Sequence, residues 1–193
     1  MDLEERLTQV DELRGLIPSE DGWYLAGLAE AAPNTIVELG SFEGLSTSYL
    51  AAGARHGNGA HVFAVDAWDL DGNVYGKHGF TDPTHRERFE EQIRAVSLWS
   101  QVTQVQAFTT QAAAEWDNGP VDLLFIDADH HYQSVRDDYT AWEPHLAPSA
   151  VVVFDDLDTK PNPGVRRFVD ELAKARPDWT FAKEGQRLGV FRT

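Results

Sequence analysis

Cysteine is absent from this 193-residue chain, which excludes disulfides, thiolate metal sites and thiol catalysis. No apolar run approaches the roughly 18 residues that a membrane-spanning helix needs. The N-terminal stretch MDLEERLTQVDELRG also lacks the basic and apolar regions of a signal peptide. From these absences we expect a cytoplasmic protein with no membrane partner.

Basic residues are scarce. The chain has 16 Lys and Arg against 32 Asp and Glu, for a formal net charge of -16. Such a surface repels the phosphates of DNA, RNA and anionic lipids, so nucleic acid is not expected as a partner. We expect part of the acidic excess to serve solubility and part to be gathered in a metal site.

Apolar strand-like runs alternate with amphipathic stretches along the whole chain. This pattern predicts a mostly parallel sheet with helices on both faces, in one domain over residues 1–193. Two N-terminal helices are expected within 1–31, a substrate loop or lid at 67–90, and a C-terminal antiparallel hairpin around Gly185. The other strands are expected at 35–40, 61–66, 102–108, 121–127 and 150–156, and the longest helices at 2–14, 44–55, 84–97, 131–145 and 162–175.

A glycine-containing turn follows the first predicted strand. Gly40 allows a tight turn and close approach of a ligand, Gly44 allows close helix packing, and Ser46 offers a hydroxyl. Asp66 ends the next strand. Its separation in sequence from the glycine turn is that expected of an acceptor for a ribose diol. The spacing Gly-x-x-x-Gly also fits a plain turn glycine and a packing glycine. Glu38, just before the turn, favours a cationic amino-acid ligand over the pyrophosphate of NAD.

Three aspartates stand at the ends of two later strands. Asp127 ends one strand, and Asp155 and Asp156 end the next. Because neighbouring parallel strands end side by side, their carboxylates are expected to converge, and such carboxylates repel unless a proton or a cation lies between them. Oxygen ligands favour Mg²⁺, with Mn²⁺ or Ca²⁺ as alternatives. Helix or turn capping would explain one Asp at each strand end, but not the pair.

His130 follows Asp127 by three residues. A neutral imidazole at that place can accept a proton from a substrate hydroxyl, so we interpret His130 as a general base. The alternatives are a metal ligand or a solvent-facing loop histidine, and the adjacent His131 could be mistaken for the base. Asp129 would either orient His130 or lie on the surface.

These residues together resemble class I S-adenosylmethionine methyltransferases, and within them the metal-dependent O-methyltransferases. That group includes catechol O-methyltransferase, the macrolide-sugar O-methyltransferases and small bacterial families. The segment IDADHHYQSVRDDYTAWEPHLAPSAVVVFDD carries the resemblance, which covers about residues 34–156. It implies a Rossmann-like, doubly wound, seven-stranded sheet. The sequence departs from the family pattern at Pro148-Ser149-Ala150, at Asp129 and in the segment 67–90.

The resemblance also assigns residues. It makes Asp127, Asp155 and Asp156 the metal ligands and His130 the base. The implied S-adenosylmethionine contacts are Glu38, Gly40, Ser41, Gly44, Ser46, Asp66, Phe108, Thr109 and Asp127, with Phe108 and Thr109 forming the adenine wall.

The function implied is metal-dependent methylation of a vicinal hydroxyl on a small molecule, with a sugar or a glycosylated natural product favoured. A catechol-type phenol methyltransferase, an NAD-dependent oxidoreductase and a non-catalytic binding protein remain alternatives, and the chain could form a homo-oligomer. In the long loop, Trp68, Tyr75, His78 and His85 would either line the substrate pocket or pack the loop onto the body.

Overall fold

The computed structural model describes residues 1–68, 70, 83–160 and 163–193. Its centre is a seven-stranded sheet in the order β3-β2-β1-β4-β5-β7-β6. Strands β1 to β5 pair in parallel, and β7 runs antiparallel to both β5 and β6. The strands are β1 (Thr35–Leu39), β2 (His61–Asp66), β3 (Val102–Gln106), β4 (Val121–Ile126), β5 (Leu146–Phe154), β6 (Thr180–Glu184) and β7 (Leu188–Arg192). This confirms the predicted doubly wound sheet with its antiparallel hairpin.

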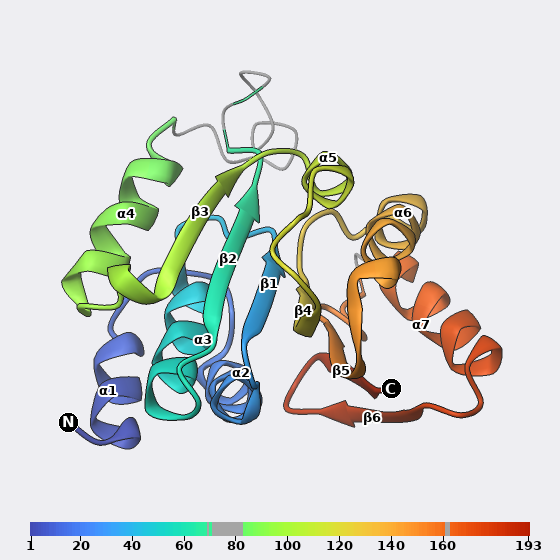
Figure 1. Ribbon diagram of the computed structural model, residues 1–193, viewed down its shortest axis with the longest axis horizontal. Helices are drawn as coiled ribbons and strands as arrows, with labels where there is room; N and C mark the ends of the chain where they lie inside the picture. The colour runs from blue at the N-terminus through green and yellow to red at the C-terminus, as the bar shows by residue number, and fades with distance from the viewer. Residues whose placement is uncertain (69, 71–82, 161–162) are drawn as a thin grey trace.

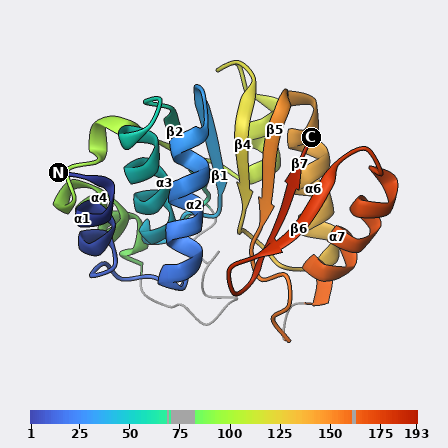
Figure 2. The ribbon, with the colours of Figure 1, turned by 90° about the horizontal axis from the view of Figure 1, so that it is seen from below.

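Helices cover both faces of the sheet (Figures 1 and 2). One layer holds α1 (Leu3–Val10), α2 (Ser19–Ala31), α3 (Leu45–His56) and α4 (His85–Ala95), and the other holds α5 (Thr109–Ala114), α6 (Tyr132–Trp142) and α7 (Pro163–Ala175). Successive strand residues serve opposite layers: Ile36 packs with the first and Val37 with the second. The period-two burial explains why the central strands are apolar throughout.

Local sequence accounts for several boundaries. Asp2 and Glu5 form a reciprocal capping box that starts α1. In α7, the buried residues Val165, Phe168, Val169 and Leu172 repeat at helical spacing and make one apolar stripe. None of the helices among the described residues is long and apolar enough to span a membrane.

Some predicted elements differ from the observed ones. The first helix ends at Val10 instead of residue 14, and β5 begins at Leu146, four residues before the expected start. The helix α5 was not predicted, because TTQAAA is one short stretch without an apolar stripe. The expected loop or lid at 67–90 falls largely outside the described residues, although α4 occupies its last part.

The antiparallel direction of β7 places its first residues at the edge of the sheet where β5 ends. Phe154, at the end of β5, pairs with Gly189, near the start of β7. The β6–β7 turn therefore lies at the same edge as the carboxyl ends of the parallel strands, where Figure 2 shows it close to α2. Arg187, just before β7, is brought to that edge by this topology.

Candidate active site

A cavity of about 630 Å³ lies at the carboxyl edge of the sheet. Its walls come from the segment 15–17, the loops after β1 to β5, and the β6–β7 turn. Nearly all the site residues expected from the sequence line it: Gly40, Ser41, Gly44, Ser46, Asp66, Phe108, Thr109, Asp127, His130, Asp155 and Asp156. The exception is Glu38, which lies behind the wall.

The turn between β1 and α3 needs glycine at two places. Gly40 has φ 88°, and a Cβ there would lie 2.4 Å from the carbonyl oxygen of Asp127. Gly44 has φ 89°, and its Cβ would meet the ring of Phe89 at 2.8 Å. Residues other than glycine rarely adopt either of these backbone conformations. Gly40 therefore lets β1 and the β4 loop come together under the cavity, and Gly44 starts α3 without a side-chain cap.

Glu38 is fully buried behind this turn. One carboxylate oxygen, Oε2, accepts hydrogen bonds from Ser41 Oγ at 2.7 Å and from Thr47 Oγ1. The other, Oε1, accepts no hydrogen bond from the described residues. Burial raises the pKa of Glu38 to about 7, although the hydroxyls of Ser41, Ser46 and Thr47 oppose the rise. The expected carboxylate is present, then, one layer below the cavity surface.

Asp66 is engaged by the backbone. Its Oδ2 accepts the N–H groups of Ser41 at 2.8 Å and Phe42 at 2.9 Å, and its Oδ1 accepts that of Trp68 at 2.6 Å. These three backbone N–H groups, all from described residues, hold the carboxylate in one orientation. Asp66 fixes the glycine turn and still lines the cavity, where its predicted contact with a ribose stays a prediction.

Phe108 and Thr109 form another part of the wall, between β3 and α5. The Phe108 side chain is 46% exposed, which is high for a large apolar residue. Thr109 Oγ1 donates to Asp138 of α6, and the Thr109 carbonyl accepts from Trp142 Nε1 at 3.0 Å. Burial raises the pKa of Asp138 to about 6. The wall thus presents one exposed ring on a firmly anchored turn.

The three aspartates of β4 and β5 converge as expected. Burial raises the pKa of Asp127 to about 8 and that of Asp155 well above its usual value, with the neighbouring carboxylates adding to both shifts. Arg187 opposes them. Its Nη2 lies 2.9 Å from Asp155 Oδ2, and its Nη1 lies 3.2 Å from Asp156 Oδ1. The guanidinium of Arg187 is thus the positive group that pairs with Asp155 and Asp156.

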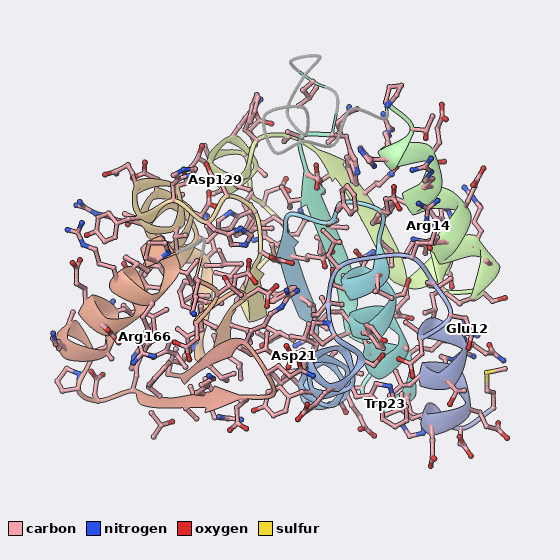
Figure 3. All side chains as sticks on the ribbon, turned by 180° about the vertical axis from the view of Figure 1, so that it is seen from behind. Glu12, Arg14, Asp21, Trp23, Asp129 and Arg166 are labelled. Atoms are coloured by element: carbon pink, nitrogen blue, oxygen red, sulfur yellow. The ribbon has the colours of Figure 1, made fainter. Side chains whose placement is uncertain are left out.

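Arg187 also reaches two other parts of the chain. Its Nη2 donates to the Leu16 carbonyl at 3.0 Å, and its Nε lies 3.9 Å from Asp21 Oδ2. Asp21, at the start of α2, is fully buried and accepts the Gln186 N–H at 2.6 Å (Figure 3). The β6–β7 turn is thereby joined to the N-terminal segment at the cavity wall.

The site does not fit a divalent cation in this arrangement. The guanidinium of Arg187 pairs with two of the three expected ligands, and Asp127 faces His130. Across the part of the chain that the structure describes, no group of three His, Asp or Glu side chains is disposed to hold a metal ion. The expected convergence of Asp127, Asp155 and Asp156 is seen, but a protein side chain takes the place expected for Mg²⁺, Mn²⁺ or Ca²⁺.

His130 lies at the rim of this cluster. Its Nε2 is 3.2 Å from Asp127 Oδ1 and 3.7 Å from Asp156 Oδ2, and the side chain is 26% exposed. Asp129, labelled in Figure 3, has other partners. Asp129 instead accepts hydrogen bonds from the backbone N–H of His131 at 3.0 Å and from Ser134 Oγ at 2.9 Å. The carboxylates that can orient His130 are therefore Asp127 and Asp156.

Two of the four loop residues pack onto the body. Trp68 is buried, donates from Nε1 to the Phe42 carbonyl at 2.9 Å, and meets the edge of Phe89. His85 is buried 2.9 Å from Glu43. Neither lines the cavity. Tyr75 and His78 lie outside the described residues.

Sequence reasoning missed Arg187, Asp21 and Asp138. Arg187 had a usable signal, because a final strand antiparallel to its neighbour must begin where that neighbour ends. Asp21 and Asp138 had none, since acidic residues in the first turn or on the surface of a helix are common.

Family comparison places the chain among known proteins. A model of the methyltransferase domain family matches residues 37–157. An uncharacterized protein, y4gI, of Sinorhizobium fredii (strain NBRC 101917 / NGR234) is 32% identical over 155 residues. The match covers 77% of this chain and 16% of that protein, so the chain spans about a sixth of its relative.

Three solved structures share the fold. Cofactor-bound Rv0187 from MTB has a TM-score of 0.69 at 21% identity, over 98% of this chain and 88% of that one. The O-methyltransferase TomG of Streptomyces achromogenes, in complex with SAM, has 0.68 at 18%, over 99% and 88%. An O-methyltransferase of Bacillus cereus, in complex with SAH, has 0.66 at 20%, over 99% and 90%. With the cavity at the carboxyl edge and the match over 37–157, the chain belongs to the methyltransferase domain family.

Proposed function

We propose that this chain transfers the methyl group of S-adenosylmethionine to a hydroxyl of a small polyhydroxylated molecule, with His130 as general base. The observation that carries the proposal is a single cavity that is lined both by the glycine turn at the start of α3 and by His130. One bound pair of reactants could therefore lie between a donor subsite and a base. Alignment of two reactants in one site can supply a large part of the rate enhancement of a group transfer.

The residues around the glycine turn fit the methionine part of the donor. The first N–H groups of α3 have no side-chain cap, so they are available to a carboxylate. Oε1 of buried Glu38 is without a hydrogen bond among the described residues, directly behind the turn. It offers the negative charge that an ammonium group requires, acting through or beside the thin Gly40 backbone.

The adenosine part would extend along the other wall. Asp66 lines the cavity, and Phe108 offers an exposed ring on which a flat base can stack. We assign the ribose to the neighbourhood of Asp66 and the adenine to Phe108 and Thr109. The donor, when bound, supplies an electrophilic methyl group.

His130 acts as the general base in this proposal. With Nε2–H donating to Asp127 Oδ1, Nδ1 is the nitrogen left to accept. Attack of the substrate oxygen forms the O–CH₃ bond as the S–CH₃ bond breaks, and the hydroxyl proton ends on Nδ1. The positive imidazolium lies beside Asp127 and Asp156; it is stabilised by negative charge on them and in turn favours ionisation of Asp127. No step in this proposal passes through a metal ion.

The chemistry of the wall favours a neutral substrate. Asp127, Asp129, Asp137, Asp155 and Asp156 all line the cavity, and Arg187 is the Lys or Arg among its described lining residues. Carboxylates accept hydrogen bonds from sugar hydroxyls but repel phosphates and carboxylates. A sugar or a glycosylated natural product therefore fits better than an anionic substrate, and it also offers more hydroxyl donors than a catechol.

The test uses a methyl-labelled donor with a panel of glycosides and catechols. His130→Ala is expected to lower turnover by about 10²–10⁴-fold while changing the affinity for S-adenosylhomocysteine little. His131→Ala is the matched control, because His131 is an adjacent imidazole that is 82% exposed and pairs with Asp129. Equal turnover of the two variants would remove His130 from its role.

The donor itself is tested by calorimetry. S-adenosylhomocysteine is expected to bind the full chain, and NAD is not, because the charge of Glu38 behind the glycine turn disfavours a pyrophosphate there. Binding of NAD with none of S-adenosylhomocysteine would favour an oxidoreductase. Binding of S-adenosylhomocysteine with no transfer to any hydroxyl would leave a non-catalytic binding protein.

A further inference from the structure

Arg187 is held at the acidic edge more firmly than a surface arginine. Its side chain is only 20% exposed, and it lies within 4.0 Å of carboxylate oxygens of Asp21, Asp155 and Asp156. Asp21 and Asp155 are almost completely buried. Burying several carboxylates together is costly unless a cation lies between them. The position of this guanidinium is thus dictated by the charges around it.

The three nitrogens of Arg187 each face an acceptor of the protein. Nη2 serves both Asp155 and the Leu16 carbonyl, Nη1 faces Asp156, and Nε faces Asp21. A guanidinium with acceptors or carboxylates on several sides is pre-organised, since they restrict its rotamer. A divalent ion placed on the same carboxylates would have to displace it against its own positive charge.

We infer that Arg187 is the resident cation of this active site: its guanidinium occupies the place between the carboxylates that a divalent metal would take, and methyl transfer by this chain is metal-independent. The inference rests on the proposed function, because it concerns the same site. Arg187 acts as a positioning residue. It fixes Asp156, which together with Asp127 faces His130, and it ties Leu16 into the cavity wall.

This assignment also explains the acidic pair at the end of β5. Asp155 points to the interior, where it is 1% exposed and 2.9 Å from Arg187. The side chain of Asp156 is more exposed, at 13%, and its Oδ1 faces Arg187 while its Oδ2 faces His130 at 3.7 Å. One carboxylate therefore anchors the guanidinium, and the other links it to the base.

The experiment measures binding of Mn²⁺ alone to the purified full chain, by electron paramagnetic resonance and by calorimetry. Wild type is expected to bind no Mn²⁺ at millimolar concentration, and its melting temperature is expected to be the same with EDTA. Arg187→Gln removes the charge and keeps much of the size. It is expected to bind Mn²⁺ with a dissociation constant at least about tenfold below the lower limit set for wild type, because a positive charge leaves the carboxylates.

Arg187→Lys is the matched control, since it keeps the charge and loses the planar fork. It is expected to exclude Mn²⁺ as wild type does. A role limited to packing would leave Mn²⁺ binding equal in the Gln and Lys variants, so that result overturns the inference. A stoichiometric Mn²⁺ site in wild type that disappears in Asp156→Asn overturns it as well, and this measurement does not depend on the folding of any Arg187 variant.

Failure of the proposed function would look different. If the inference holds and the function does not, wild type excludes Mn²⁺ and fails to bind S-adenosylhomocysteine. If the function holds and the inference does not, S-adenosylhomocysteine binds, labelled methyl is transferred, and excess EDTA abolishes the transfer. Methyl transfer that continues unchanged in EDTA supports both the proposed function and the inference about Arg187.

Discussion

Two sides of one cavity are stabilised in different ways. On the donor side, Asp66 and Glu38 hold the turn after β1 through backbone N–H groups and hydroxyls. On the acidic side, Asp155 and Asp156 are held by a single guanidinium that comes from the other end of the chain. The first side is local in sequence and depends on backbone conformation. The second depends on charge balance between distant segments, so the two should respond to different changes.

The largest expected effect is on the donor side. Gly40→Ala places a Cβ 2.4 Å from the Asp127 carbonyl at a φ of 88°, so backbone strain and a backbone clash add. We expect a loss of about 4 kcal/mol in the free energy of unfolding and loss of S-adenosylhomocysteine binding, measured by urea denaturation and calorimetry.

Gly27→Ala is the control for this change. A Cβ at Gly27 meets nothing within 4 Å, and Gly27 lies within α2. Alanine there is expected to be neutral or to stabilise by up to about 1 kcal/mol. If Gly40→Ala behaved like Gly27→Ala, the donor side would not depend on the backbone as described.

The next effect concerns pH. The folded pKa of Glu38, about 7, is raised above the ordinary value of 4.5, so folded Glu38 holds a proton that the unfolded chain has released. Its contribution is fully present below pH 4.5 and is lost as the pH rises to about 7, a change of about 3 kcal/mol. Glu38→Gln removes this dependence. The difference in unfolding free energy between wild type and Glu38→Gln, measured across this range, isolates Glu38 from Asp127, Asp138 and Asp155, whose pKa values are raised in the same direction.

Donor affinity should follow the opposite trend. An ammonium group binds the charged carboxylate, so wild type is expected to bind S-adenosylhomocysteine more tightly as the pH rises through about 7. Glu38→Gln should show a flat and weaker profile. An unchanged affinity in Glu38→Gln would mean that the carboxylate serves the turn alone.

The sequence predicted the donor side better than the acidic side for a physical reason. Gly40, Ser41 and Asp66 follow strands whose order is fixed by right-handed crossovers, so their meeting can be predicted from local patterns. The convergence of Asp127 with Asp155 follows in the same way. The partner of these aspartates was missed, because an ion pair with Arg187 depends on the direction of the last hairpin and on the segment before α2. Glu38 shows a second limit, since its place below the cavity surface depends on which face of β1 it occupies.

A smaller effect is expected on the acidic side. Arg187→Met leaves Asp21, Asp155 and Asp156 without their guanidinium and should lower the free energy of unfolding by about 2 kcal/mol. This loss is less than for a fully buried ion pair, because Arg187 is 20% exposed and the carboxylates can take up protons.

Arg166→Met is the control for Arg187→Met. Arg166 pairs with Asp158 and Asp170 on the surface, 46% exposed, and its loss should cost under about 1 kcal/mol. Equal losses in the two variants would show that Arg187 stabilises the fold no more than a surface arginine does.

The smallest effect tests the adenine wall. Phe108→Ala removes an exposed ring from the cavity, with little change in packing because the side chain is already 46% exposed. If that ring stacks on adenine, its loss weakens S-adenosylhomocysteine by about 1 kcal/mol, about fivefold in dissociation constant, by calorimetry. Phe181 is a matched exposed phenylalanine, 37% exposed on β6 and away from the cavity lining, so Phe181→Ala should bind as wild type does. Because Phe108 belongs to neither charged network, a loss confined to affinity, with unchanged turnover at saturating donor, would place it on the donor side of the comparison. A loss of turnover alone would place it beside the substrate instead.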